Sequence, residues 1–200
     1  MKKLLSIVFL VLAAVLQIEA QANSKQVRAV AAIEQLGGKV EYDAATHLVI
    51  KVDLHGTKVS DADLVNLESL HDLQTLDLRL TTIGDAGAAH LKNLKKLTFL
   101  NLFRTNLTDN GLAKLKGLRQ LDTLLLGGTK ISDDGLKNLK NLAKVRKISL
   151  FQTAISDAGL KYLERLPSLA VLLTTGSKIT PAGAESLKKL LPNISFSEQT

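Results

Sequence analysis

Apolar and polar positions repeat along this chain with a period of 24 residues, from residue 47 to residue 190. In the clearest copy, which runs from Leu97 to Leu118, Leu100 and Leu102 flank the polar Asn101. Such alternation is typical of a strand with its leucines on one face. The same positions are apolar in the other copies, in the columns Leu76, Leu100, Leu124, Ile148, Leu172 and Leu78, Leu102, Leu126, Leu150. Each of the six copies therefore predicts one short strand whose leucines face a shared core.

A helix is predicted after each strand. In the same copy a Thr-Asp pair precedes apolar residues three positions apart, Leu112 and Leu115. In the last copy Thr180 precedes Pro181, and proline favours the first helical position, so Thr180 is the predicted N-cap. By the same register the remaining N-caps are Ser60, Thr108, Ser132 and Ser156, with Gly84 as a weak exception.

A column of hydroxyl residues lies between each strand and helix: Thr57, Thr81, Thr105, Thr129, Thr153 and Ser177. We expect each hydroxyl to point inward and to bond to backbone groups of the neighbouring coil. One coil cannot bury its leucines alone, whereas six stacked coils turn the leucine columns into a continuous core.

The segment Ile155–Leu160, which reads Ile-Ser-Asp-Ala-Gly-Leu, resembles the I-T/S-D-x-G-L signature of the cysteine-containing class of leucine-rich repeat proteins. That class includes the substrate-reading parts of F-box proteins and many short secreted bacterial proteins. The resemblance implies an α/β fold: a right-handed solenoid with a parallel β-sheet on the concave face and short helices on the convex face. It also implies protein recognition through the concave face. The chain departs from the class because Thr replaces its Cys and no F-box precedes the repeats.

The two ends predict a leader and two caps. Residues 1–22 have two lysines, an apolar run and a final Ala20-Gln21-Ala22, a pattern typical of a signal peptide; a retained membrane anchor is the alternative. Residues 23–46 predict an N-terminal helix-strand cap, because an amphipathic helix ends at Gly37-Gly38 and a strand follows. Residues 47–190 hold the six repeats, and residues 191–200 form a truncated seventh repeat or C-terminal cap.

The chain has no cysteine, which excludes disulfides and thiol chemistry. An exported repeat protein without disulfide caps is expected to be bacterial, and periplasmic or secreted. No nucleophile elbow, Walker loop or zinc signature occurs, so we predict a non-enzyme without cofactors. A small acid–base cluster of His55, Asp53 and Asp77 is conceivable, although solvated strand residues explain these side chains equally well.

The net charge of +7 is distributed in columns. Acidic residues recur in the first helical turn (Asp61, Asp85, Asp109, Asp133, Asp157), and lysines recur near the helix ends (Lys92, Lys116, Lys140, Lys188). This arrangement complements the helix dipoles. The functional alternative is a cationic convex ridge that contacts anionic envelope polymers or lipid headgroups. A calcium-binding function of the aspartates is a further alternative, and no nucleic-acid partner is predicted.

The candidate site is the concave face, where strand positions outside the leucine columns project. The predicted protein-binding residues are Asp77, Arg79, Phe99, Asn101, Phe103, Arg104, Leu125, Gly127, Lys147 and Phe151. Exposed aromatic residues are strong evidence for binding in a chain with 4% aromatic residues. Phe103 and Phe151 lie two coils apart, ~10 Å, with Gly127 between them. Two interpretations remain: a notch between the two rings, or two rings that shield the glycine.

Two functions from different classes follow. The first is an exported protein-binding module that uses its concave face to bind another protein or peptide. The alternative is an envelope-associated structural protein that binds through its cationic convex side. Self-assembly through the exposed seventh strand is a third possibility. Because six short strands offer only ~500 Å² of face, below the ~800 Å² per partner of a standard interface, a peptide or loop is the expected partner.

Overall fold

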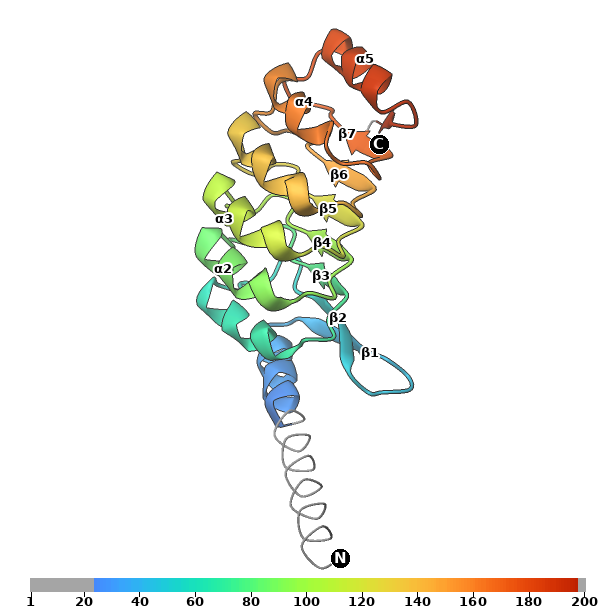
Figure 1. Cartoon of the computed structure of the whole chain (residues 1–200). Helices are drawn as coiled ribbons and strands as arrows, with labels where there is room; N and C mark the ends of the chain where they lie inside the picture. The colour runs from blue at the N-terminus through green and yellow to red at the C-terminus, as the bar shows by residue number, and fades with distance from the viewer. Residues whose placement is uncertain (1–23, 198–200) are drawn as a thin grey trace, which may run out of the picture.

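The computed structural model describes residues 24–197. Its strands form one sheet in which neighbours in sequence are neighbours in space, in the order β1 to β8. Figure 1 shows the strands stacked along one side of an elongated molecule and the helices along the other side. The protein is therefore an α/β solenoid with an unclosed sheet. We call its two long surfaces the sheet face and the helix face.

The strands are short and keep the predicted register. They are β1 (Lys39–Tyr42), β2 (Val49–Asp53), β3 (Thr75–Asp77), β4 (Phe99–Asn101), β5 (Thr123–Leu125), β6 (Lys147–Ser149), β7 (Val171–Leu173) and β8 (Ser195–Ser197). From β2 to β8 the pairing is parallel, and Leu100 lies between Leu76 and Leu124. The 24-residue period is thus the spacing between hydrogen-bonded partners on adjacent coils.

The helix face carries one short helical segment or pair of segments per coil. They are η1 (Ala62–Ser69), α2 (Asp85–His90), η2 (Leu91–Asn93), α3 (Asp109–Lys114), η3 (Leu115–Gly117), η4 (Asp133–Asn141), α4 (Asp157–Leu163) and α5 (Pro181–Leu190). Several are 3₁₀ helices, which are common where a connector must stay short. An amphipathic helix over residues 24–35 precedes them.

The leucine columns form one continuous core between the two faces. Leu76, Leu100 and Leu124 are 0% exposed, as are the leucines of the neighbouring column. Complete burial of such a side chain contributes roughly 1.5–3 kcal/mol, so the repeated leucines supply most of the stabilisation. Each column crosses several coils, which makes every coil dependent on the next.

An aspartate ladder joins the coils on the helix side of this core. It consists of Asp61, Asp85, Asp109, Asp133 and Asp157. In each of the last four, one carboxylate oxygen accepts a hydrogen bond from the backbone N–H of the next coil's capping residue, and the other accepts from its hydroxyl. Asp109, for example, accepts from Ser132 N at 2.8 Å and from Ser132 Oγ at 2.6 Å. These aspartates are therefore ties between coils as well as partners of the helix dipole.

The aspartate ladder also explains the recurring glycines. A Cβ added to Gly135 would collide with Oδ1 and Cγ of Asp109, and Gly111, Gly159 and Gly183 stand in the same relation to the preceding aspartates. None of these four glycines has a positive φ. Lack of space, not backbone conformation, is thus the reason for glycine in this column.

The predicted N-caps are confirmed for four helical segments and wrong for one. Thr180, Thr108 and Ser156 precede helices and accept hydrogen bonds from backbone N–H groups, while Ser132 occupies the cap of η4 without such a bond. The prediction for Ser60 is wrong because η1 begins one residue later, with Asp61 at the cap. Ser60 instead donates its backbone N–H and its hydroxyl to Asp63.

The threonine column bonds differently from the prediction. Thr105 donates its hydroxyl to the carbonyl oxygen of Leu102, three residues earlier in the same coil, at 2.9 Å. Thr57, Thr81, Thr129 and Thr153 make the equivalent bond. The hydroxyls therefore close the turn of their own coil and do not link neighbouring coils. Ser177 departs from the column, since its hydroxyl oxygen accepts from Ile179 N.

The ends of the solenoid differ from its middle. At the start, β1 is antiparallel to β2, and the helix over residues 24–35 buries Ala29 and Ile33 against the first coil. At the other end, β8 pairs with β7. The predicted leader, residues 1–22, lies outside the described residues. Among the helices that are described, none has the length and apolarity that crossing a bilayer would require.

Candidate functional site

The sheet face is shaped by a small turn at the end of each strand. The side chain of Asp53 accepts a hydrogen bond from the backbone N–H of His55, two residues later, at 3.0 Å. Asp77 and Asn101 accept in the same way from the residues two positions on, also at 3.0 Å. This is the local bond that Asx side chains make at turns. These three polar side chains therefore hydrogen-bond to the backbone of their own turn.

Asn101 is a correction to the predicted binding set. Its side chain is buried, with the residue 4% exposed, and its amide Nδ2 donates to Asp77 Oδ2 at 3.3 Å. Arg79 Nε lies 3.4 Å from the same carboxylate oxygen. Asn101 thus positions Asp77, which in turn holds Arg79 on the surface. Of these three predicted residues, Arg79 is the one that is available to a partner.

Of the candidate acid–base cluster, His55 and Asp53 form a pair, and Asp77 bonds to Asn101 and Arg79 instead. His55 Nδ1 lies 2.7 Å from Asp53 Oδ1. Burial alone would raise the pKa of Asp53, but the hydrogen bonds from His55, together with the charge of Arg79, outweigh it and lower that pKa. No hydroxyl or thiol nucleophile bonds to this pair within residues 24–197. In the same part of the chain, no group of three or more His, Cys, Asp and Glu residues could hold a metal ion.

The notch expected between Phe103 and Phe151 is not open. The two ring centroids are 6.0 Å apart with an interplanar angle of 42°, so the rings approach each other over Gly127. A Cβ added to Gly127 would lie 3.0 Å from Phe103 Cδ2 and 3.1 Å from Phe151 Cβ, and the glycine is buried. The ~10 Å prediction assumed rings that stand upright on their strands. Attraction between tilted rings and burial of the glycine favour the closed arrangement.

Arg104 extends the aromatic pair into a larger surface. Its guanidinium carbon lies 5.1 Å from the centroid of the Phe103 ring, a cation–π contact. Its Nη2 donates to Gln152 Oε1 at 3.4 Å, two coils away. To reach that far the side chain passes over Gly128, where an added Cβ would lie 2.7 Å from Arg104 Cγ. Arg104 is exposed, and its guanidinium is positioned by the Phe103 ring and by Gln152.

Sequence reasoning named Arg104 but missed the rest of the row of residues to which it belongs. Leu80, Arg104 and Gln152 have positive φ angles of 58°, 53° and 52°. The equivalent residues on the other coils are Gly56, Gly128 and Gly176, also with positive φ. Glycine in three of the six coils at the same register was the available signal. The conformation lets each N–H reach a carbonyl of the next coil, as Leu80 N does with Phe103 O at 2.8 Å.

Leu80 is the unexpected member of this row. It combines a left-handed backbone, which costs a non-glycine residue roughly 1–2 kcal/mol, with a side chain that is 50% exposed. The backbone conformation serves the hydrogen bond to Phe103 O, but glycine would adopt it without strain, and such strain tends to occur at functional sites. We define the edge patch as Leu80, Phe103, Arg104, Phe151 and Gln152.

The remaining predicted residues flank the edge patch. Phe99 and Leu125 are half-buried on β4 and β5, and they therefore present only part of their apolar surface. Lys147 is exposed at the start of β6, and its ammonium group is in no ion pair within the described chain. The predicted set is thus divided between an exposed patch and residues that support it.

Stacked coils, leucine columns and one parallel sheet define a leucine-rich repeat solenoid. The model of the family described as "Leucine Rich repeat" matches residues 69–91 and 93–116. The protein is therefore a leucine-rich repeat protein. Its likeness to the cysteine-containing class remains a prediction. A sequence comparison with curated proteins finds no match.

Solved structures share the fold. Internalin C2 from Listeria monocytogenes is 27% identical with a TM-score of 0.54, over 68% of this chain and 55% of that one. An internalin (inlF) from the same species is 22% identical with a TM-score of 0.53, over 77% and 51%. The leucine-rich repeat ectodomain of the plant membrane receptor kinase GASSHO1/SCHENGEN3 from Arabidopsis thaliana, solved in complex with CASPARIAN STRIP INTEGRITY FACTOR 2, is 19% identical with a TM-score of 0.54, over 80% and 22%. The matched region spans about half the length of either internalin.

Proposed function

We propose that this protein is an exported, non-enzymatic binding module that holds a peptide or loop of another protein on its sheet face. The observation that carries the proposal is the edge patch. It gathers an exposed leucine, two aromatic rings, a guanidinium and an amide within four successive coils of one face. Aromatic and arginine side chains dominate the binding energy of protein interfaces.

The chemistry of the edge patch suits a short segment with an apolar anchor and an acidic or carbonyl group beside it. The tilted rings of Phe103 and Phe151 offer an apolar surface, and Leu80 extends it across one more coil. Arg104 is fixed by its ring contact and by Gln152, so little side-chain entropy is lost when a partner binds. The planar guanidinium can bond to a carboxylate with two parallel N–H groups.

Export is proposed from the leader pattern of residues 1–22. The two internalins and the plant ectodomain support a binding module only at the level of the shared fold. The lack of catalytic function is likewise proposed. It is supported by the sheet face, where the His55–Asp53 pair lacks a neighbouring nucleophile within the described residues.

The test is site-specific photocrosslinking in the cells that make the protein. A crosslinking amino acid replaces Leu80 in the edge patch or, as a matched control, Val65 on the helix face. Both side chains are apolar and 50% exposed, so they differ in location and not in accessibility. We expect a discrete crosslinked protein from position 80 and none from position 65.

Specificity is tested by adding Arg104→Gln to the Leu80 probe. This change keeps a hydrogen-bonding side chain and removes the charge and the ring contact. It should weaken the crosslink by roughly tenfold, because a hot-spot arginine contributes about 1.4 kcal/mol or more. Equal crosslinks from positions 65 and 80, or a crosslink that ignores Arg104, would place the binding surface elsewhere.

A further inference from the structure

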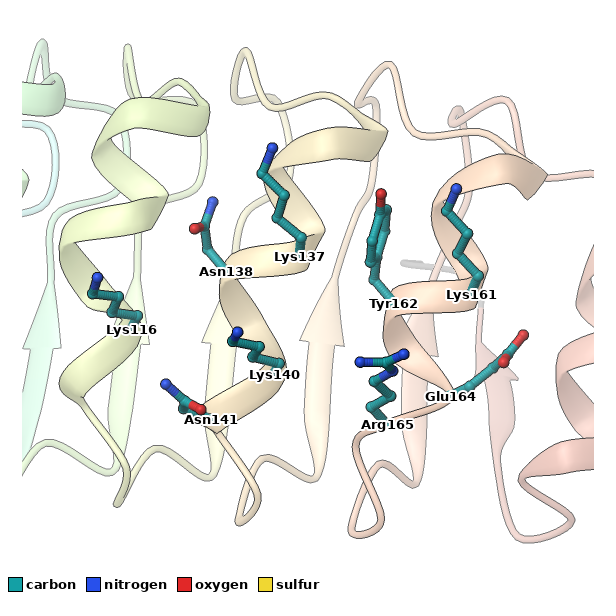
Figure 2. Close-up of a pocket in the computed structure, with 9 residues that line it drawn as sticks. All are labelled: Lys116, Lys137, Asn138, Lys140, Asn141, Lys161, Tyr162, Glu164 and Arg165. Carbon is teal, nitrogen blue, oxygen red and sulfur yellow. The ribbon is translucent and has the colours of Figure 1, made fainter.

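The helix face has two adjacent hollows that are lined by cations. The larger, of about 730 Å³, lies between η4 and α4 and is lined by Lys116, Lys137, Lys140, Lys161 and Arg165 (Figure 2). The smaller, of about 400 Å³, lies one coil earlier and is lined by Lys92, Lys95 and Lys114, with Lys116 shared between the two. We call these eight residues the basic track. It crosses four successive coils.

The cations of the basic track lack carboxylate partners. Elsewhere some cations are paired, as in Lys96–Asp72 and Arg146–Asp122, and others, such as Lys147, are not. Within residues 24–197 no carboxylate oxygen lies within ion-pair distance of any member of the track. The one acidic residue in the lining of the larger hollow, Glu164, points away from its centre in Figure 2. The track therefore presents a field of uncompensated positive charge.

Helix dipoles explain only part of this field. Lys92, Lys116 and Lys140 each lie in the last turn of a helical segment, where a cation is favoured. Lys95 follows η2, and its ammonium donates hydrogen bonds to the carbonyl oxygens of Lys92 and Gly117 at the ends of two helical segments. Arg165 follows α4, whereas Lys137 lies in the middle of η4, away from its last turn. Like charges that are gathered in one recess repel one another, so Lys137 adds a cost that the dipole does not offset. A bound anion would remove that cost.

The larger hollow also has neutral groups that suit a sugar. Tyr162 stands between η4 and α4 with its ring in the hollow, and Asn138 and Asn141 project from η4 (Figure 2). Lys161 lies 5.0 Å from the centroid of the Tyr162 ring. An aromatic ring can stack on the apolar face of a pyranose, and a carboxamide both donates and accepts hydrogen bonds as hydroxyl groups require. Two of these groups also have partners in the fold, since Asn138 Nδ2 donates to the carbonyl oxygen of Gly135 at 3.0 Å and the Tyr162 hydroxyl donates to Asp134 Oδ1 at 3.5 Å.

We propose that the basic track binds a linear acidic polysaccharide. The lysines and Arg165 neutralise its acidic groups, while Tyr162 and the two asparagines contact a sugar in the larger hollow. The track crosses three helix-to-helix steps of about 8–10 Å each, or roughly 24–30 Å, so the ligand is a polymer that lies across the coils. A short oligosaccharide that fills one hollow should bind more weakly than the polymer.

This site is separate from the sheet face, because the leucine core lies between the two surfaces. The inference therefore stands whether or not the edge patch binds a protein. It also differs in kind: the polysaccharide is held by a repeated charge, whereas the edge patch offers one set of rings and one guanidinium.

The experiment measures binding of the full chain to polygalacturonate, with neutral dextran as the reference polymer, at about 0.15 M ionic strength. The triple variant Lys116→Gln, Lys140→Gln, Arg165→Gln removes three charges from the track. The matched control Lys58→Gln, Lys130→Gln, Lys178→Gln removes three exposed, unpaired lysines outside it, within the same described chain. We expect about 100-fold weaker binding for the first variant and at most about twofold for the control.

A second variant tests the sugar contact. Tyr162→Leu keeps an apolar side chain against the core and removes the ring. We expect it to weaken polygalacturonate binding by about tenfold and to leave binding of inorganic polyphosphate unchanged, since polyphosphate has no sugar to stack.

Three results would overturn the proposal. The first is equal loss of affinity in the track variant and the control variant, which would show a diffuse charge effect. The second is binding of polyphosphate, single-stranded DNA or vesicles with anionic lipid as tightly as polygalacturonate with no effect of Tyr162→Leu, which would show a general anion surface. The third is binding of dextran as tight as that of polygalacturonate, which would show that charge is not recognised.

Discussion

At the scale of single residues, the edge patch contains a conflict between stability and exposure. Leu80 has a positive φ and an exposed apolar side chain, whereas glycine takes the same position on three of the other coils. Asparagine tolerates the left-handed region better than leucine and adds no backbone entropy to the unfolded chain, as glycine would. Leu80 therefore lowers the stability of the protein to present its side chain.

Leu80→Asn should raise the free energy of unfolding by about 0.5–1 kcal/mol. The measurement is urea unfolding at equilibrium. Val65→Asn is the control, because Val65 is equally exposed but has no positive φ; it should leave stability within about 0.5 kcal/mol. A clear loss of stability in Leu80→Asn would mean that the leucine has a structural role that its exposure conceals.

The sequence identified most members of the candidate site but not their roles. Asn101 lies at a strand position that faces the sheet surface, yet its side chain hydrogen-bonds to Asp77 and to the backbone N–H of Phe103. The alternation of a strand gives the face to which a side chain belongs and does not give its rotamer. The sequence left both a notch and two shielding rings open for Phe103 and Phe151 for the same reason, because tilting two rings over Gly127 is a choice between rotamers.

At the scale of elements, the aspartate ladder couples each helix start to the next coil. Asp109 bonds to both the backbone and the hydroxyl of Ser132, and Gly135 makes room for the carboxylate. Hydrogen bonds to a charged group contribute more than neutral ones, typically about 1.5–3 kcal/mol. The sequence places these residues in columns, but a column alone does not show that the bond is to the next coil and not to the helix that the aspartate begins.

Asp109→Ala should destabilise the protein by about 2 kcal/mol, and Gly135→Ala should cost a similar amount because its Cβ displaces the same carboxylate. In the double variant the second change should cost little, since the collision is gone and alanine is favoured over glycine in a helical segment. The measurement is a double-mutant cycle of unfolding free energies. Additive costs would contradict the steric explanation for the glycine column.

Two aspartates, of which Asp157 belongs to the ladder and Asp63 does not, predict a pH dependence. Hydrogen bonds from the hydroxyl and the backbone N–H of Thr180 lower the pKa of Asp157, and those from Ser60 lower the pKa of Asp63. A carboxylate with a depressed folded-state pKa contributes stability above its unfolded pKa, about 3.9, and loses it as the pH falls through the folded pKa. The urea midpoint should therefore fall as the pH is lowered below about 4.

Asp157→Asn should flatten that acid decline, because the amide does not titrate. Glu185→Gln on α5 is the control with the same change in charge. Its carboxylate has no hydrogen-bond partner in the described part of the chain, so the acid decline should persist. An unchanged decline in Asp157→Asn would show that the ties between coils do not govern acid stability.

At the scale of the whole molecule, the repeat period determines the fold. The 24-residue spacing gave the strand register, the parallel sheet and the segregation of helices to one side, because a coil of fixed length must place equivalent residues side by side. The positions where each coil turns were less predictable. Ser60 and the threonine hydroxyls depend on local turn geometry, which many sequences satisfy in more than one way.

A solenoid with two long faces can hold two ligands without coupling between them. The edge patch and the basic track lie on opposite sides of a core in which Leu100 and Leu124 are completely buried, and no binding step at one face requires the coils to move. Coupling between sites requires an element with two arrangements that both ligands bias. The track variant should therefore keep the crosslink from position 80, and Leu80→Asn should bind polygalacturonate with its affinity changed by less than about twofold. A change of about fivefold or more in the crosslink or in the affinity would show that the coils rearrange on binding. Binding at one face would then alter binding at the other, and the solenoid would not be a rigid scaffold for a protein segment and an acidic polymer.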